Sequence, residues 1–250
     1  MVLANDFKKL KNHPAFTGSS IVAEIMLPLL KQHGITFFYF YREYADGSII
    51  NLATDNAWTQ HSYQKGYINK REKIPVEYLT NPINYFIWLP QVWPEFVIDA
   101  AVNFDIANVI AIVERHDNYI DYFGYGASRN NISIYNYYLS HLDLLQNFNR
   151  YFLLKADYLI SKFEKNRIIL VEENIHPPKL HNREYKLSNR QQQCAFLLLQ
   201  GKPSKEIASI LNLSTRTIEY YTEIMKEKLS CGNKYELIMK LQELTFDTFI

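Results

Sequence analysis

A short stretch toward the C-terminal end gathers side chains that suit contact with phosphate groups. Arg216 and Thr217 fall in the expected first turn of a helix, where a guanidinium, a hydroxyl and free backbone N–H groups can all reach an anion. Lys202 and Lys205 flank the start of the preceding helix and could do the same, although a solvated surface position suits each lysine equally well. The candidate phosphate-binding residues are Lys202, Ser204, Lys205, Ser214, Thr215, Arg216 and Thr217, and for Ser214 the expected role is to cap the helix.

The residues after Ser214 predict a helix with one buried and one exposed side. Apolar residues repeat at spacings of three and four, at Ile218, Tyr221, Met225 and Leu229. The outer side then carries Arg216, Glu219, Tyr220, Glu223 and Glu227. A helix presented in this way fits the width of a DNA major groove. Glu219, Tyr220 and Glu223 therefore become candidates for contact with base edges.

Four short helices between Leu187 and Leu244 are expected to position these side chains. The middle two form a helix-turn-helix with its turn at residues 212–214. Ser188 with Gln191 three residues later is a capping-box pattern for the first helix. Gly201 can end that helix by adopting a positive φ.

This stretch resembles the LuxR-type helix-turn-helix, a four-helix module at the C-terminus of bacterial transcription regulators. The resemblance rests on residues 187–191 (LSNRQ), 201–208 (GKPSKEIA), 217–219 (TIE) and 228–229 (KL). It implies binding to double-stranded DNA. The chain departs from the family at Glu219, where lysine is usual, at Tyr221, where histidine is usual, and at Pro203, which replaces a capping Ser or Thr. Glu219 could accept a hydrogen bond from cytosine N4 instead, or DNA binding could be weak or need a partner.

In modules of this family the last helix holds two copies together, and the resemblance implies the same for this chain. Leu237, Leu241 and Leu244 form one apolar stripe on it. This stripe is expected to hold a homodimer that contacts paired half-sites. The alternative is that the three leucines pack within the module.

Residues 1–170 predict an α/β domain, so the whole chain is expected to be α+β. Aromatic and β-branched runs flank Asp46-Gly47, and a second pair flanks residues 116–118, which predicts two hairpins. A further strand is expected at 83–89, with helices at 20–32, 56–67 and 95–103 and two more within 131–164, separated near residues 146–149. An antiparallel sheet of four or five strands flanked by helices accommodates this order. Residues 171–184, with Pro177-Pro178, predict a linker to an all-α module at 185–250.

The length and strand order of this first domain resemble, more distantly, the autoinducer-binding, PAS-like domain of quorum-sensing regulators. Trp58, Gly66, Tyr67 and Trp88 sit at similar spacings. The resemblance implies a small-molecule ligand, an acyl-homoserine lactone or another compound, held by Tyr39, Tyr41, Trp58, Ser62, Tyr67, Arg71 and Trp88. Ser62 replaces a usual tyrosine, and Arg71 replaces an aspartate that accepts the ligand's N–H. Arginine cannot accept a hydrogen bond but can clamp an anion. Equally, Arg71 fits a basic surface loop, and the aromatic residues fit an ordinary core.

Composition and short motifs limit the classes of protein and of binding site to which this chain can belong. Residues 1–178 hold 16 Lys and Arg against 18 Asp and Glu, while residues 179–250 hold 11 against 8, so the C-terminal part is the more basic. The sequence contains neither an apolar run long enough to span a membrane nor an export signal, which makes the cytoplasm the expected location. The two cysteines, Cys194 and Cys231, lack metal-ligand spacing, and Gly124-Tyr125-Gly126 is no nucleotide motif but favours a close backbone approach or a bulge.

These observations favour a transcription regulator that takes no cofactor and is not an enzyme. Its first domain would sense a small molecule and its C-terminal module would bind promoter DNA as a dimer. The alternative is an interaction protein whose helix-turn-helix face binds a protein partner rather than DNA.

Overall fold

The computed structural model describes residues 1–30, 33–69, 79, 82–87, 95–170, 187–199 and 201–248. These residues divide into two compact units. One unit holds the described residues up to 134 together with 143–170, and the other holds 135–142 and 187–248. The linker expected at 171–184 lies outside the described residues.

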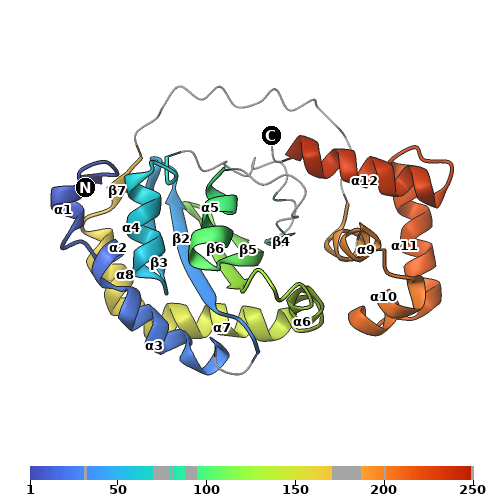
Figure 1. Ribbon diagram of the computed structural model, residues 1–250, viewed down its shortest axis with the longest axis horizontal. Coiled ribbons are helices and arrows are strands. Elements are labelled where there is room, and N and C mark those ends of the chain that lie inside the picture. The colour runs from blue at the N-terminus through green and yellow to red at the C-terminus, as the bar shows by residue number, and fades with distance from the viewer. Residues whose placement is uncertain are drawn as a thin grey trace. The chain divides into compact units, whose positions relative to one another are not determined.

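A seven-stranded sheet is the centre of the first unit (Figure 1). In spatial order its strands are β1 (Val2–Leu3), β7 (Ile168–Ile169), β3 (Ser48–Ala53), β2 (Phe37–Tyr44), β6 (Tyr119–Ala127), β5 (Ala107–Arg115) and β4 (Ile83–Ile87). All neighbours are antiparallel except β1 and β7, which are parallel. The expected antiparallel sheet is confirmed, but with seven strands instead of four or five, because two-residue strands carry no alternating pattern.

Both expected hairpins are present. Between β2 and β3, Gly47 has a φ of +76°, and Asp46 Oδ1 accepts a hydrogen bond of 2.9 Å from the backbone N–H of Ser48. Between β5 and β6, the backbone N–H of His116 donates to the carbonyl of Tyr119 at 3.0 Å. The register then places Tyr39 opposite Gly124 on the neighbouring strand β6.

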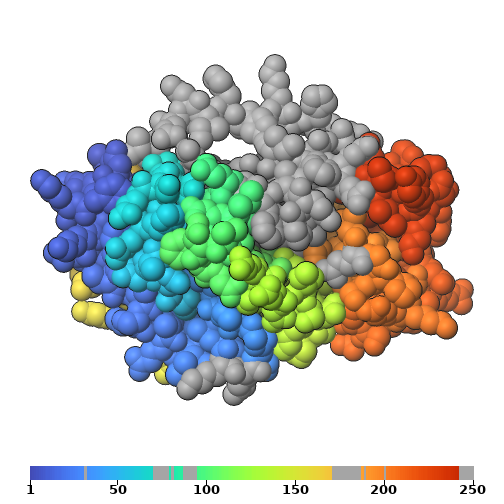
Figure 2. Space-filling model, viewed as in Figure 1, coloured from blue at the N-terminus to red at the C-terminus, as the bar shows by residue number. Residues whose placement is uncertain are grey.

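Helices cover both faces of the sheet. They are α1 (Phe7–Leu10), α2 (Pro14–Thr17), α3 (Ser19–Leu30), α4 (Asn56–Gln64), α5 (Glu95–Phe104), α7 (Leu142–Lys155) and α8 (Asp157–Glu164). On one face, Phe152 of α7 packs against Phe38 and Phe40, with ring centroids 4.9 and 5.4 Å apart. On the other face, α4 (cyan) and α5 (green) lie side by side (Figure 2), and their Trp58 and Phe104 pack against a buried cluster that includes Phe37.

The break expected near residues 146–149 is wrong. That segment is continuous helix inside α7, and the helical stretch divides instead at His141 and at Ala156. Asn149 does not weaken the helix because its side chain is buried and bonded on both sides. Its Nδ2 donates to Glu114 at 3.0 Å, and its Oδ1 accepts from the hydroxyl of Tyr125 at 2.5 Å.

A side chain approaches Gly124 closely, where a close backbone approach or a bulge was the expectation for the Gly124-Tyr125-Gly126 segment. A Cβ atom at Gly124 would lie 1.8 Å from a ring carbon of Tyr39, whereas one at Gly126 would lie 3.3 Å from the ring of Phe37. The ring of Tyr39 therefore occupies the space that any side chain at Gly124 would need.

Gly124→Ala is expected to destabilise the first unit by about 1–3 kcal/mol, because overpacking a filled core forces side chains from their rotamers. Gly126→Ala is the matched control, with a smaller expected loss. Urea unfolding followed by tryptophan fluorescence measures both, since all three tryptophans lie in residues 1–170. Equal losses in the two variants would contradict the special position of Gly124.

The second unit is all-α, as expected. Its C-terminal part consists of α9 (Asn189–Leu199), α10 (Ser204–Leu211), α11 (Thr215–Lys228) and α12 (Lys234–Thr248), and α6 (Ile134–Ser140) also belongs to it from Tyr135 onward. Its core includes Leu197, Ile207, Ile218 and Met225, none of them more than 1% exposed. Cys194 is buried, and burial raises the pKa of its thiol to about 11. No described helix is long and apolar enough to cross a membrane.

Candidate nucleic-acid interface

The turn between α10 and α11 has the expected geometry. Asn212 ends α10 in the left-handed conformation at φ +53°, and the backbone N–H of Leu213 donates to the carbonyl of Ala208 at 2.9 Å. Ser214 then caps α11 by accepting a hydrogen bond of 3.0 Å from the backbone N–H of Thr217. The capping role expected of Ser214 is confirmed, and it fixes the direction in which α11 starts.

The other predicted helix ends are also confirmed. The backbone N–H of Ser188 donates to the side chain of Gln191 at 3.0 Å, and Ser188 Oγ accepts from the backbone N–H of Gln191 at 3.4 Å, which completes the capping box. Gly201 has a φ of +75°. Pro203 stands at the N-cap of α10, where it offers no side-chain hydrogen bond.

The buried side of α11 differs from the expectation at one residue. Ile218, Met225 and Leu229 are buried, but Tyr221 is only half-buried and Thr222 takes its place in the core. Thr222 can be buried because its hydroxyl donates to the carbonyl of Ile218 at 2.8 Å, which leaves its methyl group free to pack. The outer residues Arg216, Glu219, Tyr220, Glu223 and Glu227 are all exposed, as expected.

The candidate phosphate-binding residues differ in their availability. Lys205 and Arg216 are exposed. Lys202, which precedes α10, forms an ion pair with Glu206 of that helix, and only 18% of the lysine side chain is exposed. The hydroxyl of Thr217 lies 2.7 Å from Ser214 Oγ, within the cap. Ser204 and Thr215, the first residues of α10 and α11, are half-buried. Arg216 and Lys205 are thus the cations best placed for an outside partner.

The leucine stripe of α12 is packed within the chain. Leu237 is fully buried and Leu241 is 4% exposed, and α12 contacts α9 and α11. The expectation that these two leucines form a dimer contact is wrong, because the core of the module already covers them. Tyr235 and Met239, one turn apart on another face of α12, are 72% and 43% exposed. The side chain of Leu244 lies outside the described residues.

Those candidate ligand residues of the first unit that the structure describes share one layer, between the sheet and helices α4 and α5. Tyr39 and Trp58 pack against the same cluster of buried residues, and Tyr41 is 2% exposed. Ser62 is buried and donates within its own helix to the carbonyl of Thr59 at 2.8 Å. Tyr67 is 7% exposed, with its ring 6.2 Å from that of Trp58. Arg71 and Trp88 lie outside the described residues.

A polar group that no local sequence pattern predicts borders this layer. Asp99 of α5 accepts a hydrogen bond of 2.8 Å from the hydroxyl of Tyr67, lies 2.7 Å from Nε2 of His61, and accepts from Asn103 at 2.7 Å. The hydrogen bonds from Asn103 and His61 lower the pKa of Asp99 to about 2, while burial and the bond to Asp99 raise that of Tyr67 to about 12. The group therefore holds a carboxylate beside aromatic rings.

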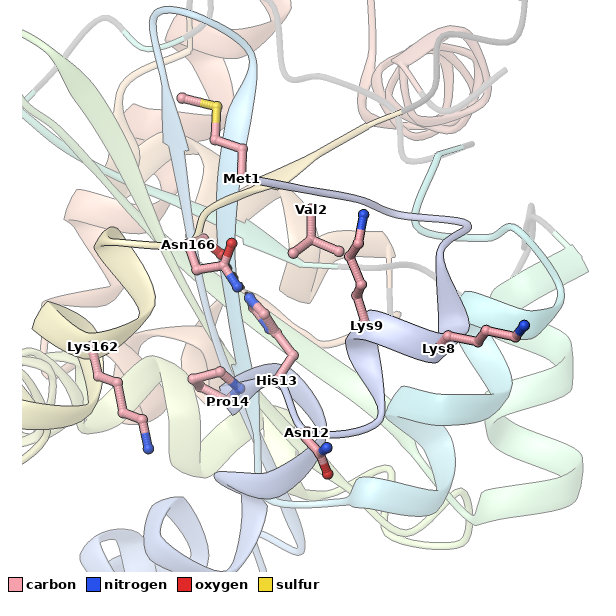
Figure 3. Close-up of a pocket in the computed structure, with 9 residues that line it drawn as sticks. All are labelled: Met1, Val2, Lys8, Lys9, Asn12, His13, Pro14, Lys162 and Asn166. Atoms are coloured by element: carbon pink, nitrogen blue, oxygen red, sulfur yellow. Dashed lines mark hydrogen bonds between the residues drawn. The ribbon is translucent and has the colours of Figure 1, made fainter.

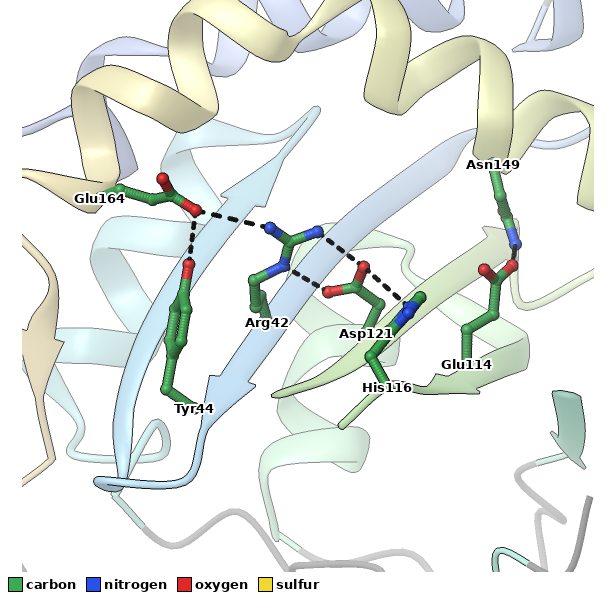
Figure 4. Close-up of polar contacts among 7 residues, drawn as sticks. All are labelled: Arg42, Tyr44, Glu114, His116, Asp121, Asn149 and Glu164. Atoms are coloured by element: carbon green, nitrogen blue, oxygen red, sulfur yellow. Dashed lines mark hydrogen bonds and ion pairs between the residues drawn. The ribbon is translucent and has the colours of Figure 1, made fainter. Parts of the chain in front are cut away.

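A second polar network lies on the opposite face of the sheet (Figure 4). Arg42 donates to both carboxylate oxygens of the fully buried Asp121, at 2.6 and 2.8 Å. Glu164 of α8 lies 3.5 Å from the same guanidinium and accepts from the hydroxyl of Tyr44 at 2.9 Å, while His116 lies 3.6 Å from Asp121. Burial raises the pKa of Asp121, which the bonds from Arg42 oppose. This network joins β2 and β6 to the end of α8.

An open pocket of about 480 Å³ lies near α1 and α2 (Figure 3), and none of the candidate ligand residues lines it. Lys8, Lys9 and Lys162 line it, but their side chains point in different directions. His13 is already bonded at both ring nitrogens, to the backbone N–H of Ala15 and the carbonyl of Asn166. The pocket therefore lacks converging donors. The described residues contain no group of His, Cys, Asp or Glu that could hold a metal ion.

Comparisons with solved structures give long but distant alignments. The crystal structure of Escherichia coli SdiA aligns over 90% of each chain, with a TM-score of 0.41 and 14% identity. A complex of SdiA with octanoyl-rac-glycerol gives a TM-score of 0.42 and 15% identity, over 90% of this chain and 88% of that one. A Vibrio cholera VqmA–ligand–DNA complex gives a TM-score of 0.26 and 13% identity, over 90% of this chain and 88% of that one. All three TM-scores are below 0.5.

Comparisons with sequences concern the C-terminal module. The transcriptional activator protein AhyR of Aeromonas hydrophila is 37% identical over 54 residues, 22% of this chain and 21% of that protein. The transcriptional activator protein AsaR of Aeromonas salmonicida gives the same values, so the chain matches about a fifth of the length of these relatives. The family model described as bacterial regulatory proteins, luxR family, matches residues 185–241. The part of the chain that is similar to this family is therefore the C-terminal module, which contains the helix-turn-helix of α10 and α11.

Proposed function

We propose that the chain is a transcription regulator that binds promoter DNA through α11. The observation that carries this proposal is the exposed outer side of α11, which starts at a capped turn and lies within the luxR-family match. A helix that enters the major groove contacts base edges with its N-terminal residues and phosphates with its first turn. Arg216 and Lys205 then bind phosphates, supported by Lys202, Ser204, Thr215 and Thr217.

The organisation proposed around this module has three parts. Residues 1–170 form the sensing domain, 171–184 the linker and 185–250 the DNA-binding domain. The sensing domain takes a small molecule between the sheet and helices α4 and α5. The support for this position is the layer of aromatic rings with a few polar groups, Tyr67 and Asp99 among them, which is typical of a ligand site. The ligand is an acyl-homoserine lactone or another small molecule.

The chain acts as a homodimer in this proposal. With Leu237 and Leu241 inside the module, Tyr235 and Met239 are the apolar residues of α12 that remain to contact a second copy. A two-fold dimer doubles the number of phosphate contacts, and this matters because a single module carries only a small excess of positive charge.

Arg216→Ala in the full chain is expected to weaken binding to every duplex by about 1 kcal/mol, because a phosphate contact carries no sequence information. The slope of log affinity against log salt should also fall by about 1 per module. Gel-shift titrations of genomic fragments at low and moderate salt measure both. Arg129→Ala, a change at an exposed arginine of the first unit, is the matched control and should alter neither.

Two results would count against the proposal. Loss of affinity for only one base position would remove Arg216 from phosphate binding. Absence of salt-dependent binding by the unaltered protein, even at low salt, would contradict the regulator itself and favour a protein partner for the α11 face.

A further inference from the structure

Helix α11 is unusual for a DNA-binding helix because the charges along its whole length sum to zero. Arg216, Lys226 and Lys228 are balanced by Glu219, Glu223 and Glu227 within residues 215–228. A carboxylate facing the phosphates of DNA is repelled unless a base supplies a hydrogen-bond donor. Each glutamate on this surface must therefore be neutralised, lie beyond the bases, or accept a hydrogen bond from one.

Glu223 is neutralised within the helix. Lys226 Nζ lies 2.7 Å from Glu223 Oε2, one turn further along α11. The side chain of Lys226 is only 19% exposed, so its ammonium group is held close to the surface of the module and close to this carboxylate. The pair presents little net charge to an approaching duplex.

Glu219 is the carboxylate that remains unneutralised near the start of α11. It is exposed, and it forms no ion pair with any other residue in the described part of the chain. It lies five residues after the N-cap Ser214, in the second turn. That is the part of a recognition helix that contacts base edges, whereas Glu227 lies two turns further away.

The major groove offers two kinds of amino donor, cytosine N4 and adenine N6. A carboxylate can only accept hydrogen bonds. When one oxygen accepts from adenine N6, the other oxygen therefore faces the acceptor N7, whereas cytosine itself presents no acceptor beside N4 in the major groove. Resting on the proposed DNA-binding function, we infer that Glu219 is a specificity-determining residue that selects cytosine at one position of each half-site. The same charge lowers affinity for duplexes that lack the cytosine, which widens the gap between specific and non-specific binding.

The test is selection from a library of random duplexes by the full-length protein and by Glu219→Gln. The unaltered protein should select a motif with a fixed cytosine in each half-site. Glu219→Gln should reduce the preference for that cytosine about 10-fold, because glutamine pairs with adenine N6 and N7 instead, and should leave the other positions unchanged. Glu227→Gln makes the same change of charge on the same helix and should retain the cytosine.

The outcomes separate the inference from the function on which it rests. If the unaltered protein selects no motif at low salt, both fail. If it selects a motif that Glu219→Gln does not change, or that Glu227→Gln changes at the same position, DNA binding stands and the role of Glu219 is wrong. Circular dichroism of both variants confirms that the exposed substitutions leave the helices intact.

Discussion

Replacing Asp121 by alanine is expected to lower the free energy of unfolding of the first unit by about 3–5 kcal/mol. Asp121 is fully buried and accepts two hydrogen bonds from Arg42, which is itself 9% exposed. The guanidinium cannot lose its charge, so the variant leaves a buried cation without its closest partner. Glu164, 3.5 Å from Arg42 and with 46% of its side chain exposed, compensates only in part. Urea unfolding monitored by tryptophan fluorescence measures the loss.

Two controls separate the ion pair from simple loss of packing. Glu164→Ala removes the exposed partner of Arg42 and should cost less than about 1 kcal/mol, as surface ion pairs do. Arg42→Met combined with Asp121→Leu removes both charges and should recover most of the stability, because a well-packed apolar pair can replace a buried ion pair. If the double variant is as unstable as Asp121→Ala, the loss comes from packing and the ion-pair account is wrong.

Local patterns in the sequence predicted the parts of the fold that local chemistry decides. The hairpin at Asp46-Gly47, the cap at Ser214 and the positive φ of Gly201 each depend on residues within one turn of the chain. The order of helices and strands was also predicted from local patterns, and this order is the basis for expecting a sheet flanked by helices. Such features require a special backbone conformation or a nearby hydrogen bond, and few residue types provide either.

Pairs of side chains across the sheet could not be predicted. Arg42 and Asp121 are 79 residues apart, and they meet because the register of β2 and β6 places them directly opposite each other. The bond between His61 and Asp99 likewise joins α4 to α5 over 38 residues. A shift of one residue in the register of β2 and β6 would move Arg42 or Asp121 to the other face of the sheet. The pattern of hydrophobic residues does not specify the register of these two strands to one residue.

Sequence patterns also gave wrong predictions where the side chain of a polar residue forms its own hydrogen bonds. Thr222 replaced Tyr221 in the core of α11 because a threonine hydroxyl can bond to the preceding turn, which a count of apolar residues does not register. Asn149 did not break α7, because its side chain bonds to Tyr125 and Glu114 across to the sheet. In both cases a tertiary contact or a local hydrogen bond outweighed the usual preference of the residue type, for an exposed position at Thr222 and against a helix at Asn149.

Leu237→Ala is expected to destabilise the C-terminal module by about 2–5 kcal/mol, the usual cost of a cavity at a fully buried leucine. Hydrogen exchange of the full chain, followed by mass spectrometry, should show faster exchange in α9, α11 and α12, because α12 contacts the other two. The loss should not depend on protein concentration, since Leu237 packs within one chain.

The matched control lies on another face of the same helix. Met239→Ala, at a residue that is 43% exposed, should change stability by no more than about 0.5 kcal/mol, because alanine suits a helix and little surface is uncovered. If Tyr235 and Met239 contact a second copy, Met239→Ala should instead shift the monomer–dimer equilibrium in sedimentation. The reverse result, with Leu237→Ala dissociating a dimer at unchanged module stability, would restore the leucine stripe as the dimer contact. The two variants thus show which side of α12 contacts the second copy. That contact determines the spacing at which the two copies of α11 can bind DNA.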